Sequence, residues 1–224
     1  MKHLYLISFA SFILLAACKK EKISGSGSVV TETRALNNFT SVQASGPVMI
    51  FIEKGPQISV KVKAFENLLP YFESNVTNGV LDVHWKNNID VHGDLTVYVT
   101  LPELRSVKVS GRSATRVQGE FSGTDMEVSL SGGAYVFLYH QQADNFLVTL
   151  SGTGFFPGLG TVTHLDAFGM TCKKATVNLT GDGTVELSCL NELKVKIAGP
   201  GDVLYKGNPI VVSDISGGGM LYKR

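Results

Sequence analysis

The sequence predicts an all-β protein, with a parallel β-helix in its C-terminal part and a less regular β region before it. Apolar and polar residues alternate over short runs, as in strands with one buried face, and the long i, i+3, i+4 patterns of amphipathic helices are missing. In the second half of the chain, glycine recurs in phase with pairs of aliphatic residues. A β-sandwich, with these glycines at ordinary turns, is the alternative fold.

The N-terminus has the pattern of a lipoprotein signal. Its apolar run, from Leu4 to Ala17, is shorter than the roughly 20 residues that a membrane-spanning helix needs. The run ends at Leu15-Ala16-Ala17-Cys18, which resembles a bacterial lipobox. We therefore expect residues 1–17 to be a signal peptide and Cys18 to carry the lipid that anchors the chain in a membrane. The alternative is an ordinary cleavage site followed by a core cysteine.

A polar segment rich in glycine and serine follows the predicted lipidation site. Residues 18–28 are therefore expected to form a lipidated, flexible tether. Residues 29–224 are expected to form one β domain. An exported and anchored chain of this kind is expected at the outer membrane, either on the cell surface or facing the periplasm.

The charge balance argues against a nucleic-acid partner. The chain has 20 basic and 19 acidic residues, and removal of Lys2 with the signal peptide leaves 19 of each, a net charge of zero. Metal and cofactor sites are not expected either. The histidines of the mature chain are scattered without ligand spacing, and the sequence has no CxxC pair. These histidines are His84, His92, His140 and His164.

Residues 29–103 are expected to contain irregular strands and one hairpin. Asn78-Gly79 lies between two apolar runs, a pattern typical of a type I′ turn between antiparallel strands.

Residues 104–224 contain the repeat. Six glycines each follow Ser, Thr or Ala, and all but the last are preceded at two and four residues by aliphatic side chains. Such repeats cannot bury a face alone, so they predict rungs that stack on one another. We expect Phe168-Gly169 to be a degenerate copy within the longest interval, and Phe156 to be the counterpart of Val136. The aligned glycines are Gly111, Gly132, Gly152, Gly181, Gly199 and Gly217.

The ordered series of Val-x-Leu-Ser-Gly units resembles a known family. It ends in Ile197–Pro209 and Ile215–Gly219, and the similarity extends upstream to Phe39–Val42 and Ser45–Val48. Together these segments resemble the head GIN domain, a family described as putative auto-transporter adhesins. The resemblance implies a cell-envelope β-helix without an established enzyme activity.

Two cysteines provide a check on the predicted rungs. Cys172 lies seven residues before Leu179, and Cys189 lies eight residues before Ile197, so both fall at nearly the same place in successive repeats. Neighbouring strands are about 4.8 Å apart, within the Cα range of a disulfide. We therefore consider a Cys172–Cys189 disulfide, with a reduced and stacked core pair as the alternative.

An aromatic stripe is the candidate binding site. If Val136 and Leu138 face inward, Tyr135, Phe137 and Tyr139 point outward, and Phe155 is expected beside Tyr135 in the next rung. Exposed aromatic side chains stack on sugars or anchor protein partners. The alternatives are a covering loop, a subunit contact or an inverted local register.

The sequence offers no catalytic residues. Asp182 and Asp202 follow turn glycines, where aspartate commonly bonds the local backbone, and no Gly-x-Ser-x-Gly nucleophile motif is present. We therefore expect a non-enzymatic envelope lipoprotein that presents its β-helix for adhesion or for binding a glycan or protein. The alternatives are a polysaccharide-active enzyme and a structural component that forms oligomers.

Overall fold

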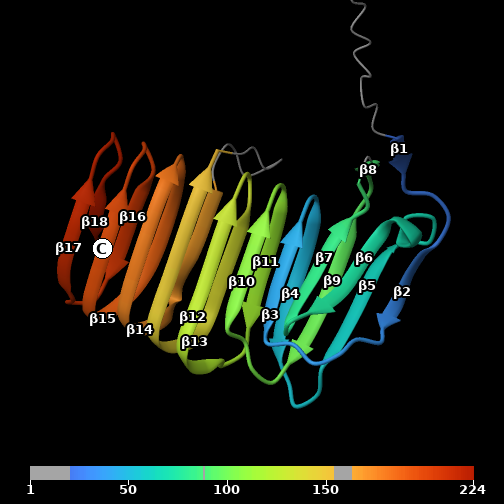
Figure 1. Cartoon of the computed structure of the whole chain (residues 1–224), viewed down its shortest axis with the longest axis horizontal. Helices are drawn as coiled ribbons and strands as arrows, with labels where there is room; N and C mark the ends of the chain where they lie inside the picture. Colours follow the sequence, from blue (N-terminus) through green and yellow to red (C-terminus); the bar gives the residue numbers. More distant parts are fainter. Residues whose placement is uncertain (1–20, 88, 154–162) are drawn as a thin grey trace, which may run out of the picture.

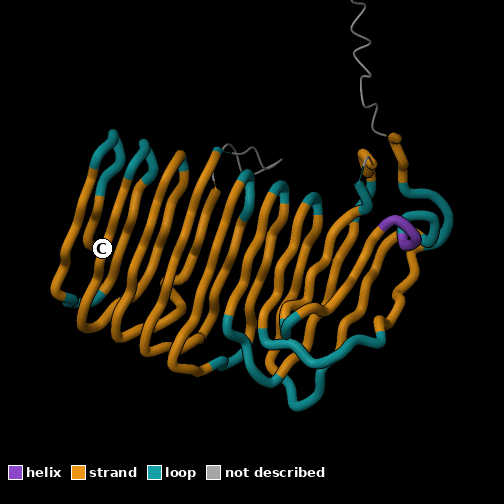
Figure 2. Tube along the Cα trace, viewed as in Figure 1, coloured by secondary structure: helices purple, strands orange, loops and turns teal. Residues whose placement is uncertain are grey.

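The computed structural model describes residues 21–87, 89–153 and 163–224, and these residues form an all-β protein, as the sequence predicts (Figures 1 and 2). A single 3-10 turn, η1 (Leu69–Tyr71), interrupts the described strands. The strands are β1 (Glu21–Ser24), β2 (Val29–Arg34), β3 (Ser41–Ser45), β4 (Val48–Lys54), β5 (Ser59–Phe65), β6 (Phe72–Thr77), β7 (Val80–Trp85), β8 (Ile89–His92), β9 (Leu95–Leu101), β10 (Ser106–Ser110), β11 (Ser113–Gln118), β12 (Ser122–Ser131), β13 (Tyr135–Gly152), β14 (Thr163–Gly181), β15 (Gly183–Ile197), β16 (Asp202–Lys206), β17 (Ile210–Ile215) and β18 (Leu221–Lys223).

One mixed sheet of 16 strands contains all of these except the small β1–β8 pair. The long strands β13, β14 and β15 each belong to two rows of strands, because their first halves and second halves pair with different neighbours. The first row contains β9, β4, β11, the first halves of β13, β14 and β15, then β16 and β18. The second row contains β7, β3, β10, β12, the second halves of the same long strands, and β17.

Within each of these rows, neighbouring strands are parallel and keep a strict register. In the second row, Val107 pairs with Val128, Val128 with Val148, and Val148 with Val177. Since side chains alternate along a strand, this register stacks aliphatic residues into one column on the inner side. The inward side chains of both rows belong to one hydrophobic cluster, so the two rows share a single core.

The aligned glycines lie directly against one another in successive strands. Gly132 has a φ of +70°, and a Cβ built on it would lie 3.1 Å from the backbone nitrogen of Gly111. Gly111 approaches Gly46 in the same way, at 3.2 Å. Residues with side chains rarely adopt this φ, and a Cβ here would make tighter contacts than most real ones, so the turn at the end of the second row favours glycine.

The predicted degenerate copy at Phe168-Gly169 is wrong. Leu150 pairs directly with Leu179, so no further rung lies between the two long strands. Gly169 pairs with Tyr139 at a shift in the register of β13 with β14, so this segment is an irregular stretch of one strand. Leu165 is the counterpart of Val136, whereas Phe156 lies outside the described residues.

The N-terminal end of the sheet is antiparallel. β2 pairs with β5, β5 with β9, and β6 with β7, all in antiparallel orientation. Asn78 and Gly79 connect β6 to β7 with φ angles of 51° and 75°. Two positive φ values at the tip of a two-residue loop are typical of the type I′ turn, so the predicted hairpin is confirmed.

Part of the predicted tether is ordered. β1 pairs in parallel with β8, and the Gly25 amide donates to the His92 carbonyl at 2.8 Å. The Asn67 side-chain amide bonds the backbone of Ser24 and Ser26. The edge of β8 and the Asn67 side chain thus supply backbone partners to residues 21–26 of the predicted tether, which composition alone does not reveal.

The predicted signal peptide and Cys18 lie outside the described residues. Within the described residues, none of the helical segments has the length and apolar character that a membrane crossing requires.

Candidate functional site

The outer side of the first row carries two of the four predicted stripe residues, Phe137 and Tyr139, as exposed or partly exposed rings. Val136 and Leu138 are buried on the inner side, which places Phe137 and Tyr139 on the outside. Tyr139 is 37% exposed and Phe137 is partly exposed. Figure 1 shows this row as part of one continuous series of strands along the long axis.

The predicted exposure of Tyr135 is wrong, since only 5% of this residue is exposed. Its ring stacks on His164 with centroids 5.8 Å apart and on Phe137 at 6.3 Å. This burial raises the pKa of the Tyr135 hydroxyl above its usual value. Tyr135 therefore offers little surface to a ligand, and the outer contact surface begins at Phe137.

The predicted neighbour of Tyr135, Phe155, lies outside the described residues. In the described part of β14, His164 is the direct partner of Tyr135. The sequence alignment missed His164 because it placed the next rung within the segment that follows Gly152.

A row of four side chains extends the stripe across neighbouring strands. Tyr98 pairs in register with Phe51, Phe51 with Arg116, and Arg116 with Phe137. The rings of Phe51 and Tyr98 stack with centroids 5.5 Å apart, and the Arg116 guanidinium carbon lies 5.6 Å from the Phe137 ring centroid. We call Tyr98, Phe51, Arg116, Phe137 and Tyr139 the aromatic face.

Sequence reasoning missed the β9, β4 and β11 contributions to this face. Val97-Tyr98-Val99 and Ile50-Phe51-Ile52 have the same pattern as Val136-Phe137-Leu138, namely an aromatic residue between two buried aliphatic residues. This pattern could have identified Tyr98 and Phe51. Only the strand register, however, places them in one row with Phe137.

Carboxylates border the aromatic face. Phe137 pairs with Asp166, and Asp166 with Glu186, so the same row continues into two acidic residues. His164 Nε2 lies 3.5 Å from Glu186 Oε2, and Asp166 Oδ1 accepts a hydrogen bond from the Phe168 amide. The face therefore offers a guanidinium, aromatic rings and carboxylates within one row of strands, a set that can bind both apolar and polar parts of a ligand.

The predicted structural role of Asp202 fits its contacts. Its Oδ1 accepts a hydrogen bond from the Met220 amide at 2.9 Å, which ties the last two turns of the first row together. Among the described residues, no group of three or more His, Cys, Asp or Glu side chains is arranged to hold a metal ion.

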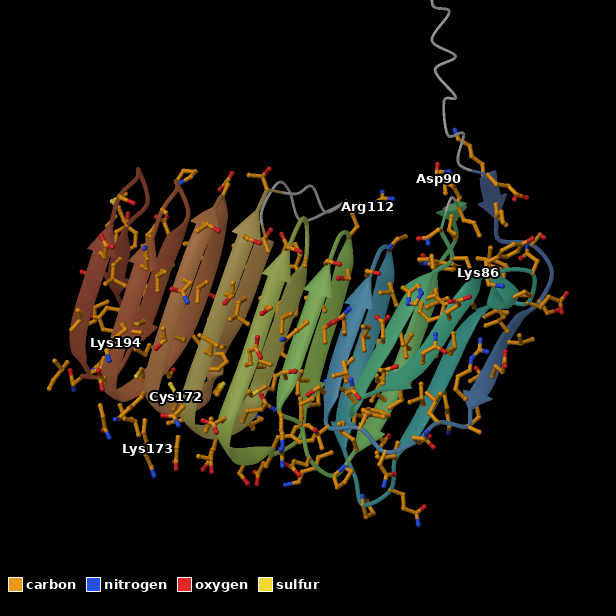
Figure 3. The ribbon with its side chains drawn as sticks, viewed as in Figure 1. Lys86, Asp90, Arg112, Cys172, Lys173 and Lys194 are labelled. Carbon is orange, nitrogen blue, oxygen red and sulfur yellow. The ribbon has the colours of Figure 1, made fainter. Side chains whose placement is uncertain are left out.

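A separate polar hollow of about 570 Å³ lies near the N-terminal end of the sheet. Trp85 forms part of its wall, with its indole nitrogen bonded to the Pro47 carbonyl at 3.0 Å. Lys86, Asp90 and Arg112 line it, and Figure 3 shows their side chains in the upper part of the view. Its two cations could pair with an anionic group, but the hollow shares no residue with the aromatic face.

The two cysteines occupy the neighbouring positions that the sequence predicts. Cys172 of β14 pairs in register with Cys189 of β15, and both are buried. Both thiols are free in this structure, so the disulfide stays a prediction.

Comparison with protein families assigns the chain. A family described as "putative auto-transporter adhesin, head GIN domain" matches residues 38–209. The chain belongs to this family. The match includes every residue of the aromatic face and confirms the resemblance that the repeat suggested. Among curated proteins, none matches this chain.

Several solved structures share the fold of this head GIN domain protein. A putative adhesin from Bacteroides fragilis aligns with a TM-score of 0.66 and 13% identity, over 90% of this chain and 100% of that one. A putative lipid binding protein from Parabacteroides distasonis gives 0.62 and 19%, over 91% and 100%. A putative adhesin from Parabacteroides merdae gives 0.60 and 19%, over 91% and 99%. At these identities the likeness shows the fold alone.

Proposed function

We propose that this head GIN domain protein is a non-enzymatic outer-membrane lipoprotein that presents a rigid parallel β-helix and binds a glycan or protein through its aromatic face. The observation that carries the proposal is the continuous row of Tyr98, Phe51, Arg116 and Phe137 on the outer side of four neighbouring strands.

The strand register supports the β-helix. From β10 onward each strand pairs in parallel with the strand of the next repeat, and the long strands pass from one row to the other. The glycine stack and the shared core repeat at each turn. A face built on such paired strands is preorganised, so a ligand does not have to order it on binding.

The residue types of the face support binding. Tyrosine and arginine are enriched at the residues that carry most of the energy of protein interfaces, and aromatic rings also pack on the apolar faces of sugars. Phe137 of this face stacks on the buried Tyr135. The aromatic side chains of the face do not belong to the hydrophobic core cluster. The exposed rings of the face are better explained by a ligand than by folding.

The anchor and location rest on the sequence and the family. The Leu15–Cys18 lipobox supports lipidation at Cys18, and the adhesin family supports a place in the cell envelope, at the surface or facing the periplasm. Asp202, one of the two aspartates considered for catalysis, accepts a hydrogen bond from the Met220 amide in a turn, so the polysaccharide-active enzyme is the weaker hypothesis.

A glycan array and a panel of immobilised envelope and host surface proteins test the binding proposal. A Tyr98→Ala/Phe137→Ala variant is expected to bind about ten-fold or more weakly than the native protein. A Thr149→Ala/Asn178→Ala variant, on the outer side of the second row, is the matched control and should bind normally. No binding to any probe, or equal loss in both variants, would contradict the proposal.

A structural, oligomerising role is a second candidate, favoured by the C-terminal edge of the sheet. Among the described strands β17 pairs with β15 alone, and its Ile210 and Val212 are 75% and 57% exposed. Natural edge strands are usually protected by charges, proline or bulges, and an apolar edge favours pairing with another strand. A second copy with the same edge could pair with it antiparallel.

Light scattering across protein concentrations tests this second role. A dimer that Val212→Lys abolishes, with Val30→Lys in the opposite edge strand β2 as the control, would support it. A monomer at every concentration would reject it and leave the aromatic face as the functional surface.

A further inference from the structure

The cysteines lie where β14 and β15 pass from the first row to the second. Cys172 and Cys189 are direct Cα partners across the parallel pairing, with exposed fractions of 1% and 0%. Figure 3 shows Cys172 near the lower edge of the sheet, in the middle of β14, with Lys173 pointing away below it. The two thiols are therefore brought together by the register of adjacent rungs, although 17 positions separate them in the sequence.

The geometry suits a covalent bond. Direct partners on neighbouring strands have Cα atoms roughly 5 Å apart, within the range of about 4.4–6.8 Å that a disulfide tolerates. Both side chains point to the inner side, as their burial shows. A hydrogen bond between the two thiols, together with burial, raises the pKa of Cys172, and the same bond lowers the pKa of Cys189 to about 7. The register and the burial therefore place the two thiols next to each other on the inner side.

The backbone pairing of β14 with β15 is interrupted at this corner. The β14–β15 register shifts between Ala167 and Cys172 and again between Cys172 and Lys174. The Cys172 thiol donates to the Ser188 carbonyl at 3.4 Å, and the Cys189 thiol contacts the carbonyls of Lys173 at 3.6 Å and Glu192 at 3.1 Å. A covalent link would hold the two rungs together where their ladder of hydrogen bonds is interrupted.

We propose that Cys172 and Cys189 form an intramolecular disulfide that joins the β14 and β15 rungs in the mature protein. It forms by exchange with an oxidising disulfide while the thiols are still accessible during folding. One thiolate attacks the oxidant and releases one thiolate; the second cysteine then attacks the mixed disulfide and releases the other. The cysteine pair loses two electrons and two protons, and the oxidant is reduced to two thiols.

The bond is expected to stabilise the fold because it closes a loop of the unfolded chain. For a loop of this length, the thermal midpoint should rise by about 5–10 °C. This inference rests on export to an oxidising compartment but not on any ligand, so a failure of the binding proposal leaves it unaffected.

Peptide mapping tests the bond directly. The full chain is purified from an oxidising compartment, and separately refolded with oxidised and reduced glutathione. Remaining thiols are alkylated in denaturant without reductant. A linked pair of tryptic peptides that contain Cys172 and Cys189, absent after reduction, is the expected result. Alkylation of both cysteines in both preparations would overturn the proposal.

Thermal unfolding tests the stabilising role. Reduced native protein should unfold at the lower midpoint, as should the Cys172→Ser/Cys189→Ser variant. Comparison of oxidised and reduced native protein remains valid if the variant fails to fold. An unchanged midpoint despite a linked peptide pair would reject the role of the bond as a link between rungs.

Discussion

The two rows of strands share one core but present different outer faces. Outside the first row lie the rings of Tyr98, Phe51 and Phe137. The corresponding outer positions of the second row hold Lys108, Ser129 and Thr149, which pair in register. Lys108 forms an ion pair with Glu127 at 3.0 Å. The hydroxyl side chains of Ser129 and Thr149 occupy the matching positions on the next two strands.

This difference separates the requirements of folding from those of binding. Both rows place aliphatic side chains inward at the same period, and the stacked glycines are common to successive turns. Stacked parallel strands of this kind need no aromatic side chains on their outer face, as the second row shows. The aromatic face is therefore an addition to the scaffold, and variants of the shared parts and of each face should behave differently.

Loss of a shared core side chain should have the largest effect. Phe146 points inward from the second row and is 2% exposed. Phe146→Ala should lower the free energy of unfolding by about 3–5 kcal/mol, because the cavity cannot collapse fully. Far-UV and tyrosine near-UV circular dichroism during urea unfolding should give the same midpoint. Separate midpoints would show that the two rows do not share one core.

A substitution in the glycine stack should have the next largest effect, and the chain contains a matched control. Gly132 and Gly79 have similar φ values, +70° and +75°, but a Cβ at Gly79 meets nothing within 4 Å. Gly79→Ala should cost about 1 kcal/mol from the backbone conformation alone. Gly132→Ala should cost clearly more in urea unfolding, because its Cβ presses on Gly111. Equal losses of unfolding free energy in the two variants would show that the close approach of Gly132 to Gly111 is not the reason why glycine recurs at this position.

Changes within the aromatic face should affect binding more than stability. Phe137→Ala removes ring contacts with Tyr135 and Tyr139 and the contact with Arg116, together worth roughly 1 kcal/mol of folding free energy. Urea unfolding and probe binding should be measured on the same preparation. A loss of stability as large as that of Phe146→Ala would show that Phe137 serves the fold.

The smallest effect is expected on the second face. A double-mutant cycle of Lys108→Ala and Glu127→Ala should give a coupling of about 0.2–1 kcal/mol that falls with added salt, since both side chains are solvent-exposed in part. Binding to the glycan and protein probes should not change. A loss of binding in either variant would move the functional surface to the second row.

The fold could be predicted where the sequence repeats at close intervals. In Val128-x-Leu130 and Val148-x-Leu150, the position of the following glycine predicts which residues pair, and the structure pairs them in this way. Val42-x-Ala44 before Gly46 has the same pattern and pairs directly with Val107-x-Val109 in the structure. In the sequence, however, the antiparallel strands β5 and β9 lie between these two copies. This insertion hides from the sequence a repeat that is continuous in space.

The candidate site could be predicted only along one strand. Alternation around Val136 and Leu138 correctly placed Phe137 and Tyr139 outside. Tyr135 stacks on His164, whose place beside it follows from the unequal repeat between Gly152 and Gly181. Arg116 belongs to the face because β11 pairs with β4 on one side and with β13 on the other. The sequence around Arg116 does not show these pairings.

The pairing of β1 with β8 shortens the free segment between the predicted lipid anchor at Cys18 and the folded sheet. Only residues 19 and 20 separate Cys18 from the start of β1. At most about 3.6 Å per residue is available, so a lipid on Cys18 would hold this end of the sheet within roughly 10 Å of the headgroups. β17 lies at the opposite end of the long axis (Figure 1). With a lipid on Cys18, the antiparallel end of the sheet would lie close to the bilayer surface. A long flexible linker would instead let the whole domain move away from the membrane.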